Sequence, residues 1–508
     1  MWYQRSFEIP EEWSGMHVFL RFGAVDYECE AFIDGTTVGR HWGGTSSFAF
    51  DITGSVSAGS AHNLVVCVRD ELRSGVQAGG KQCPDFESRG CHYTRTTGIW
   101  QTVWLEAIAP GGLTEVHIVP DVDNSRFLFT PRFAGIIEDA QFTVSLTADG
   151  RAVSKSTVTA ADGSTIPIDI GTSELWSPGS PFLYDVEFTV RKGGDIVDEV
   201  ASYSGMRKVH TQGNRVYLNN EPYYQRLVLD QGFYPDGIWT APSDEALRHD
   251  IELSMSAGFN GARLHQKVFE ERFHYWADKL GYLTWGESSS WGIDYIDPIA
   301  ARNYLSEWRE IVVRDRNHPS IVAWSPFNES SRNAGEPQHK RLHLDAYELT
   351  KAVDPTRPVN DSSGYCHYVT DLYTVHNYEQ DPEKLSGILT PTAEGDPFRN
   401  MPDHDSAYAN QPYIIDEFGG IKWDPATQDE LTPGDRKTSW GYGTAPKSID
   451  EFYERLERMV RVIRSLSHIH GFCYTQLTDV EQEQNGIYFY DRSSKFDMSR
   501  ISTIFNLE

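Results

Sequence analysis

The C-terminal three-fifths of the chain alternates short apolar runs with segments of helical periodicity, and few folds accommodate that alternation. Apolar runs such as FNGARLH are separated by amphipathic segments such as SDEALRHDIELSMSAG. This pattern is typical of parallel sheets covered by helices. Eight runs occur, beginning near residues 224, 260, 282, 322, 358, 372, 413 and 470. Since eight parallel strands close a barrel, we predict a (β/α)8 barrel over residues 208–508, with Ser243 capping its first helix.

The first 207 residues have a different pattern, in which short alternating segments are separated by Gly, Asp and Ser turns. Residues 1–109 predict a jelly-roll sandwich, and residues 110–207 predict an immunoglobulin-like β-sandwich. The expected fold class is therefore multidomain, β followed by α/β, with a C-terminal TIM barrel. A length of 508 residues fits about three domains.

Net charge narrows the range of partners. The formal charge is -28 and the pI is near 5.0, which repels phosphate backbones and anionic lipid, so neither nucleic acid nor a membrane is an expected partner. A neutral substrate fits better. The start, MWYQRSFEIP, lacks the pattern of a signal peptide, and no apolar run of about 18 residues occurs. A soluble protein of the bacterial cytoplasm is the expectation.

The six cysteines are spread along the chain without a C-x-x-C pair or framework spacing, which indicates reduced thiols. Cys83, Cys91 and His92 supply three possible metal ligands but lack a fourth at zinc-finger spacing. No metal and no cofactor is therefore expected.

Two of the apolar runs end in a glutamate. IVAWSPFNE, the fourth run, ends at Glu329, and YIIDEFG, the seventh, contains Glu417. Catalytic side chains of such barrels come from the carboxyl ends of the strands, and strands four and seven lie on opposite sides of the opening. Two facing carboxylates suit glycoside hydrolysis, because one protonates the leaving oxygen while the other attacks the anomeric carbon. The alternative is a pair of structural glutamates held in salt bridges.

Several runs also carry a family resemblance. In the barrel they are NHPSIVAWSPFNES, YIIDEFGG, FNGARLHQKV and TQLTDVEQEQNGIYFYDR; upstream they are WYQRSF, FIDGTTVGRHWGGTSSFAFDIT, TGIWQTVWLE and GMRKV. Together they resemble glycoside hydrolase family 2, which includes β-galactosidases, β-glucuronidases, β-mannosidases and some arabinosidases. Compared with that family, the sugar-binding domain is expected to be truncated at its N-terminus.

The resemblance implies a retaining double displacement with Glu329 as acid/base and Glu417 as nucleophile. Arg263 matches an arginine beside the nucleophile, and Asn328 matches a residue that binds the sugar 2-hydroxyl. Two carboxyls about 5 Å apart cannot both ionise cheaply near neutral pH. If Arg263 keeps Glu417 ionised, Glu329 is expected to hold the proton.

Further residues at strand ends are candidates to contact the sugar or to orient the nucleophile. The resemblance implies such roles for His265, His376 and Tyr378, and Asp230 follows the first barrel strand, where it is placed to accept from a sugar hydroxyl. For each of these residues a purely structural role is the alternative. Three tryptophans are candidates either to stack on sugar faces or to pack in the core: Trp285, Trp291 and Trp423.

The sugar is predicted to be neutral. Glucuronidases of the family carry an Asn-x-Lys pair that grips the sugar carboxylate, whereas the matching stretch here, EQEQNGIY, offers Glu481 and Glu483 and no lysine. The first expectation is an exo-acting β-galactosidase acting on an oligosaccharide or glycoside, in a chain that is a candidate homo-oligomer. The alternatives are an α-L-arabinofuranosidase, a β-glucuronidase, a β-mannosidase and, from another class, a non-catalytic carbohydrate-binding protein.

Overall fold

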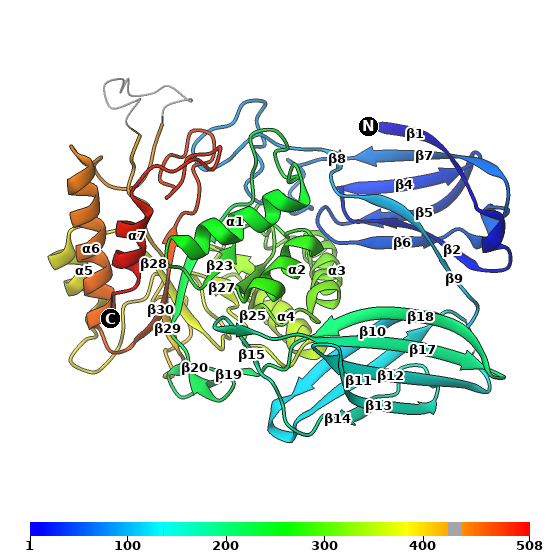
Figure 1. Cartoon of the computed structure of the whole chain (residues 1–508). Coiled ribbons are helices and arrows are strands. Elements are labelled where there is room, and N and C mark those ends of the chain that lie inside the picture. Colours follow the sequence, from blue (N-terminus) through cyan, green and yellow to red (C-terminus); the bar gives the residue numbers. More distant parts are fainter. Residues whose placement is uncertain (136, 425–438, 508) are drawn as a thin grey trace.

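A computed structural model describes residues 1–135, 137–424 and 439–507. Two β-sandwiches precede a barrel of parallel strands whose helices lie outside (Figure 1). The predicted fold class is confirmed. Within the described residues, no helix is long and apolar enough to cross a membrane.

The first sandwich packs a sheet of order β1-β7-β4-β5 against a sheet of order β6-β2-β9, and β3 pairs with β8. Side chains in β2 alternate between buried and half-buried, and its Leu20 and Phe22 share a core with Ala31 and Val66 of the opposite sheet. This is the two-residue period predicted from the sequence. The strands are β1 Trp2–Glu8, β2 His17–Phe22, β3 Val25–Asp26, β4 Glu28–Ile33, β5 Thr36–Trp42, β6 Phe48–Asp51, β7 Ala61–Arg69, β8 Gly98–Ile99 and β9 Val103–Ile108.

The second sandwich packs β13-β12-β17-β18 against β10-β11-β14 around an aromatic core that includes Phe127, Phe129, Phe142 and Phe188. Its strands are β10 Leu113–Asp121, β11 Arg126–Phe133, β12 Ala140–Ala148, β13 Arg151–Thr159, β14 Ile166–Asp169, β17 Tyr184–Lys192 and β18 Asp195–Ser204. Short antiparallel pairs lead to the barrel: β15 Trp176–Ser177, β16 Ser180–Pro181, β19 Val209–Gln212, β20 Arg215–Leu218 and β21 Glu221–Pro222.

The barrel is built around a seven-stranded parallel sheet of order β25-β24-β23-β22-β30-β29-β28. The fifth predicted run supplies only a bridge from Val359 to Trp324 and the short β27, which pairs with β26. The strands are β22 Gln225–Asp230, β23 Gly261–Leu264, β24 Leu283–Glu287, β25 Ile321–Ser325, β26 Phe327–Asn328, β27 Ser362–Ser363, β28 Tyr373–Asn377, β29 Tyr413–Gly419 and β30 Ile469–Thr475.

Helices cover the outside of this sheet. Ser243 caps the first of them as predicted, because its side chain accepts from the amide of Ala246. The helices are α1 Asp244–Ser256, α2 Glu271–Leu280, α3 Pro298–Asp315, α4 Pro337–Val353, α5 Pro382–Leu389, α6 Ile449–Ser465 and α7 Met498–Phe505. They bury the outer faces of the strands in a core that contains Ile251, Phe273, Leu456 and Phe505.

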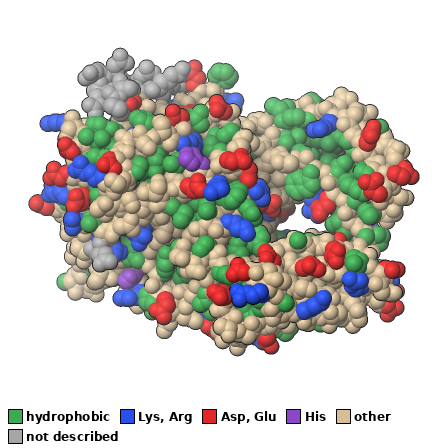
Figure 2. Space-filling view, in the orientation of Figure 1, with side chains coloured by type: hydrophobic (Ala, Val, Ile, Leu, Met, Phe, Trp, Pro, Cys, Tyr) green, Lys and Arg blue, Asp and Glu red, His purple; other side chains and the backbone are tan. Residues whose placement is uncertain are grey.

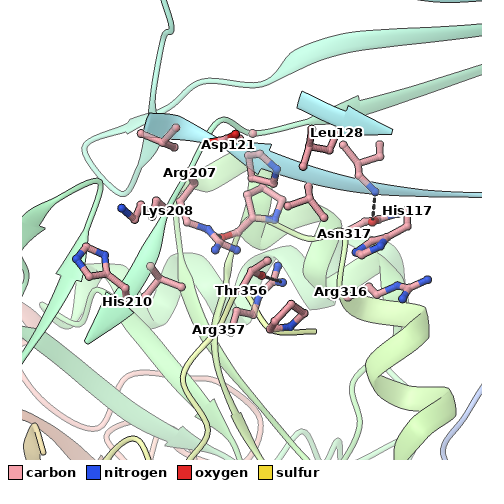
Figure 3. Close-up of a pocket in the computed structure, with 18 of the residues that line it drawn as sticks. His117, Asp121, Leu128, Arg207, Lys208, His210, Arg316, Asn317, Thr356 and Arg357 are labelled. Carbon is pink, nitrogen blue, oxygen red and sulfur yellow. Dashed lines mark hydrogen bonds between the residues drawn. The ribbon is translucent and has the colours of Figure 1, made fainter. Parts of the chain in front are cut away.

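A basic cavity of about 350 Å³ lies where the second sandwich meets the amino end of the barrel (Figure 3). Arg207 donates to the main-chain oxygens of Pro319 and Ile321, and Arg357 donates to the oxygen of Ile321 and to Asp354. Burial alone would raise the pKa of Asp354, but the Arg357 charge and hydrogen bonds from neighbouring groups lower it to about 2. Arg207, at the end of the second sandwich, therefore joins it to the barrel by satisfying main-chain oxygens, and Arg357 satisfies main-chain oxygens within the barrel.

Acidic side chains are distributed over both sandwiches and the barrel on the face seen in Figure 2, with basic groups between them. The surface thus agrees with the net charge of -28.

Candidate active site

Glu329 and Glu417 meet at the carboxyl end of the barrel. Glu329 directly follows β26, and Glu417 lies in β29. One oxygen of each carboxylate and a ring nitrogen of His376 lie within 4.8 Å of one another. Glu329 has a φ of 47°, a left-handed conformation that is uncommon for a residue with a side chain, and its amide donates to Ser363. Two carboxyls this close compete for a single proton.

His376, at the end of β28, bridges the pair. Its Nδ1 lies 2.9 Å from Oε1 of Glu329 and 3.2 Å from Oε2 of Glu417. Its Nε2 lies 3.0 Å from the hydroxyl of Ser363 and 3.4 Å from Asp416. Burial alone would lower the pKa of His376, but the charges of Glu417, Asp416 and Glu329 raise it. The imidazole is therefore the group that holds the shared proton in the ligand-free site.

The pKa of Glu329 differs from the expectation of a protonated acid. Burial acts to raise it, but the hydrogen bond from His376 and the positive charges of His376, Lys81 and Arg263 lower it. Two carboxylates and one arginine alone would leave the proton on Glu329. The structure adds an imidazolium between the carboxylates, and this charge lowers the pKa of Glu329.

Arg263, in β23, has no exposed surface and contacts four side chains. One terminal nitrogen donates to Glu417; the other lies 2.5 Å from Glu287, 3.1 Å from His265 and 3.2 Å from Oδ1 of Asn328. Burial and the Arg263 charge hold the pKa of His265 well below its usual value, so its ring is neutral. Arg263 thus lies beside Glu417, at the position predicted from the sequence.

Glu287 is a buried third glutamate at a strand end, and it was not predicted from the sequence although its run ends in the same way. It ends β24 as Glu329 ends its own run, and it accepts from Arg263 and from the amide of Gln266. Burial raises its pKa to about 7 in spite of Arg263. The run GYLTWGE belongs to the same class as the two runs that were singled out.

Tyr378 orients Glu417 from the opposite side. Its hydroxyl donates to Oε2 of Glu417 over 2.5 Å, while Arg263 takes Oε1. The ring of Tyr442 stacks on that of Tyr378 with centroids 3.4 Å apart. Both oxygens of Glu417 are thus held, which fixes the plane of its carboxylate.

Asn328 has a donor to spare. Its Oδ1 accepts from Arg263 and its main-chain oxygen accepts from the indole of Trp291, but no partner for its buried Nδ2 is present among the described residues. A buried amide without a partner is costly unless a ligand supplies one.

The other candidates lie in less direct positions. Trp285 is fully buried and donates to Gln225, and Trp423 is buried with its ring near Phe452. Of the two roles that the sequence left open for these tryptophans, the structure favours core packing over stacking on a sugar. Asp230 ends β22 and accepts from the amide of Gly232.

The charged groups near Asp230 are Asp250, Arg492 and Lys267, not Glu329 and Glu417. Burial and the charge of Asp250 raise the pKa of Asp230 to about 7, in spite of nearby Arg492 and Lys267. Cys83, Cys91 and His92 do not form a metal-ligand cluster in the described part of the chain, and the six cysteines are free.

The segment between β7 and β8 brings the first sandwich to this site. In Figure 1 its blue trace crosses from the sandwich to the barrel. Gly80 donates to the main-chain oxygens of Ser289 and Trp291, and the hydroxyl of Tyr93 donates to Glu483 over 2.5 Å. No local pattern in the sequence predicts these contacts, because they depend on the path of a loop between two domains.

Two sandwiches followed by a parallel barrel with paired carboxylates at its carboxyl end define the class of multidomain TIM-barrel proteins. Family comparison assigns each part. The sugar binding domain of glycosyl hydrolases family 2 matches residues 1–105, a model described as glycosyl hydrolases family 2 matches residues 116–207, and the family's TIM barrel domain matches residues 241–423. The chain belongs to glycosyl hydrolase family 2.

Relatives of known name include two kinds of enzyme. A β-galactosidase of Thermoanaerobacter pseudethanolicus is 24% identical over 85% of this chain and 55% of its own length. A β-glucuronidase of Bacteroides fragilis is 25% identical over 78% of this chain and 60% of its own length. The chain thus spans between 55% and 60% of the length of these two relatives.

Solved structures share the fold. The β-D-glucuronidase of Dictyoglomus thermophilum matches with a TM-score of 0.81 at 19% identity, over 100% of this chain and 90% of that one. The β-glucuronidase of Ruminococcus gnavus in complex with D-glucuronic acid matches with a TM-score of 0.80 at 18% identity, over 99% and 88%.

Proposed function

We propose that the protein is a retaining exo-glycosidase that removes a terminal sugar from an oligosaccharide or glycoside. The observation that carries the proposal is the proximity of the two carboxylates, whose oxygens approach within 4.8 Å. Retaining glycosidases hold their carboxyls about 5 to 5.5 Å apart, and inverting enzymes hold theirs about 6.5 to 9.5 Å apart to admit a water.

In the first step Glu417 attacks the anomeric carbon while Glu329 protonates the departing glycosidic oxygen. The bond to the aglycone breaks, the aglycone leaves as an alcohol, and the sugar is esterified to Glu417. The proton comes from His376, which passes it from Nδ1 to Oε1 of Glu329 along their 2.9 Å contact when the substrate is bound. Arg263 and Tyr378 hold the two oxygens of Glu417 in the plane needed for attack.

In the second step Glu329 acts as a base. Esterification removes the negative charge of Glu417, which lowers the affinity of Glu329 for a proton. Glu329 then takes a proton from water, the water oxygen attacks the anomeric carbon, and the ester bond breaks to restore Glu417. The proton on Glu329 returns to Nδ1 of His376 along the same contact, which restores the starting state. Asn328 offers its free Nδ2 to the sugar 2-hydroxyl, a contact that strengthens as charge develops on the ring.

A β-galactoside is the first candidate substrate and a β-glucuronide is the second. Relatives of both names match the chain at similar identity. The galactoside is favoured by the absence of a lysine in EQEQNGIY, and the glucuronide is favoured by Lys81, which the first sandwich brings near Glu483 of that stretch. An α-L-arabinofuranoside and a β-mannoside are the further alternatives.

A panel of p-nitrophenyl glycosides tests the proposal. We expect cleavage of one or more of the β-galactoside, β-glucuronide, α-L-arabinofuranoside and β-mannoside, with the first product carrying the anomeric configuration of the substrate in proton NMR. An inverted product would contradict the double displacement. Binding of the sugars without any turnover would favour the alternative of a carbohydrate-binding protein.

A further inference from the structure

Lys81 belongs to the first sandwich but lies beside the carboxylate pair. Its ammonium is 4.3 Å from the ring centroid of Trp291, and the indole of Trp291 donates to the main-chain oxygen of Asn328, next to Glu329. Lys81 is 6% exposed. The first sandwich thus contributes a buried ammonium group to the candidate active site of the barrel.

The segment around Lys81 is fixed on both sides. The main-chain oxygen of Lys81 accepts from the amide of Tyr93, whose hydroxyl is bonded to Glu483. Gly80 has a φ of 58°, and a Cβ at this position would come within 2.2 Å of the main-chain oxygen of Gln266. The loop therefore lies directly against the barrel, and glycine is needed for that approach.

The ammonium of Lys81 has no acceptor in the ligand-free protein. No hydrogen bond and no salt bridge within 4.0 Å is formed between its Nζ and residues 1–135, 137–424 or 439–507. Burial acts to lower its pKa, but interactions with Cys91, Glu483, Glu329 and Glu417 raise it. The lysine is thus charged and lies near three glutamates without a bond to any of them, so its donors are available to a ligand.

Lys267 gives a comparison within the same barrel. It is also fully buried, and its ammonium lies 4.8 Å from the ring centroid of Phe269. Unlike Lys81, it donates to the main-chain oxygens of Gly232 and Trp239 and lies 3.5 Å from Glu270. A lysine buried for structural reasons is satisfied here by the protein itself, and Lys81 is not.

We propose that Lys81 is a substrate-binding residue that donates to an oxygen of the terminal sugar and so helps to select it. This inference rests on the proposed glycosidase function. The acceptor is either a ring hydroxyl or the carboxylate of a uronic acid, both of which are oxygen acceptors for an ammonium.

The proposal also revises the argument for a neutral sugar. That argument assumed that no lysine stands near Glu481 and Glu483, and the assumption is wrong, because Lys81 enters from the first sandwich close enough to Glu483 to interact with its charge. Both oxygens of Glu483 are already occupied, one by Tyr93 and one by Asn485. Oε1 of Glu481 accepts from the amide of Thr94, while its Oε2 has no hydrogen-bond partner among the described residues.

The test compares Lys81→Met and Lys81→Arg with the parent on every glycoside that the parent cleaves. We expect Lys81→Met to lower kcat/KM by about 10- to 100-fold if the acceptor is a hydroxyl, with a similar factor on each substrate. If the acceptor is a carboxylate, the loss is confined to the β-glucuronide and exceeds about 100-fold. Lys81→Arg is expected to recover part of the loss. The inhibition constants of free galactose and free glucuronate are compared between the parent and Lys81→Met. Weaker inhibition by glucuronate alone indicates a carboxylate acceptor, and weaker inhibition by both sugars indicates a hydroxyl.

Stability measurements distinguish substrate binding from a structural role. Lys81→Met is expected to keep the urea midpoint of the parent or to raise it, whereas Lys267→Met is expected to lower it, because two carbonyls lose their donor. A Lys81→Met protein that keeps kcat/KM within about twofold of the parent on all cleaved glycosides would overturn the proposal. A parent that cleaves no glycoside would instead contradict the proposed function.

Discussion

Both ends of the barrel bury arginine, and the two ends use it differently. At the amino end, Arg207 and Arg357 donate to main-chain oxygens and to Asp354. At the carboxyl end, Arg263 donates to side chains alone, among them Glu417 and Glu287. The arginines at the amino end thus complete hydrogen bonds of the main chain. Arg263 at the carboxyl end instead holds the carboxylates of the candidate active site in position.

The difference extends to polar groups without partners. At the carboxyl end, Nδ2 of Asn328, Nε of Arg263 and Oδ1 of Asp416 lack hydrogen bonds within the described structure, and Lys81 lacks an acceptor. The guanidinium groups of Arg207 and Arg357 point to carbonyls that need them. At the carboxyl end, buried charged groups therefore keep donors and acceptors that a substrate can complete, whereas the guanidinium groups of Arg207 and Arg357 are completed by the protein.

The largest effect that separates the two ends is expected from Glu417→Ala. Loss of the nucleophile should lower kcat by about 10⁴-fold or more. Steady-state hydrolysis of the preferred p-nitrophenyl glycoside measures it, and azide is expected to restore turnover with a glycosyl azide of inverted configuration. The control is Glu307→Gln, which changes a buried glutamate that binds Thr45 away from the pair. Equal kcat values for the two variants would contradict the assignment.

Arg357→Met is expected to act on stability and not on chemistry. Removing this guanidinium leaves a buried Asp354 without its cation and takes away the shorter of the two hydrogen bonds to the main-chain oxygen of His318, which should cost about 3 to 5 kcal/mol of unfolding free energy. Urea denaturation measures the loss. Arg341→Met, which breaks an exposed pair with Asp345, should cost less than about 1 kcal/mol. A folded Arg357→Met protein with a strongly reduced kcat would contradict the assignment of a purely structural role to the arginines at the amino end.

The smallest effect is a shift in pH dependence caused by His376→Asn. Glu329 can act as acid only while the His376–Glu329 pair holds its shared proton, and in the parent the imidazole holds it with a raised pKa. Without the imidazole the proton must stay on Glu329 itself, a carboxyl that binds it less tightly, so the alkaline limb of the kcat/KM profile should move to lower pH by about one unit. A limb that stays in place or moves to higher pH would contradict the bridging role of His376.

Much of this arrangement could be predicted from the sequence, because local patterns carry it. A buried run that ends in a carboxylate marks a catalytic edge, and this pattern identified Glu329 and Glu417 while Glu287 was overlooked. The sequence does not predict whether Trp285 is exposed. The answer depends on the side of the strand on which its ring lies, and only the folded barrel shows this. Lys81 had no local signal at all, because only the folded path of the loop brings it to the barrel.

Covalent trapping of Glu417 tests the central claim most directly. The protein is incubated with the 2-deoxy-2-fluoro glycosyl fluoride of the sugar that it cleaves, then digested and analysed by mass spectrometry. We predict that one fluorosugar is esterified to the peptide containing YIIDEFG, at Glu417. A sugar attached to Glu329 or Asp416, or turnover of the parent glycoside with no trapped peptide and an inverted product, would contradict the double displacement at this pair.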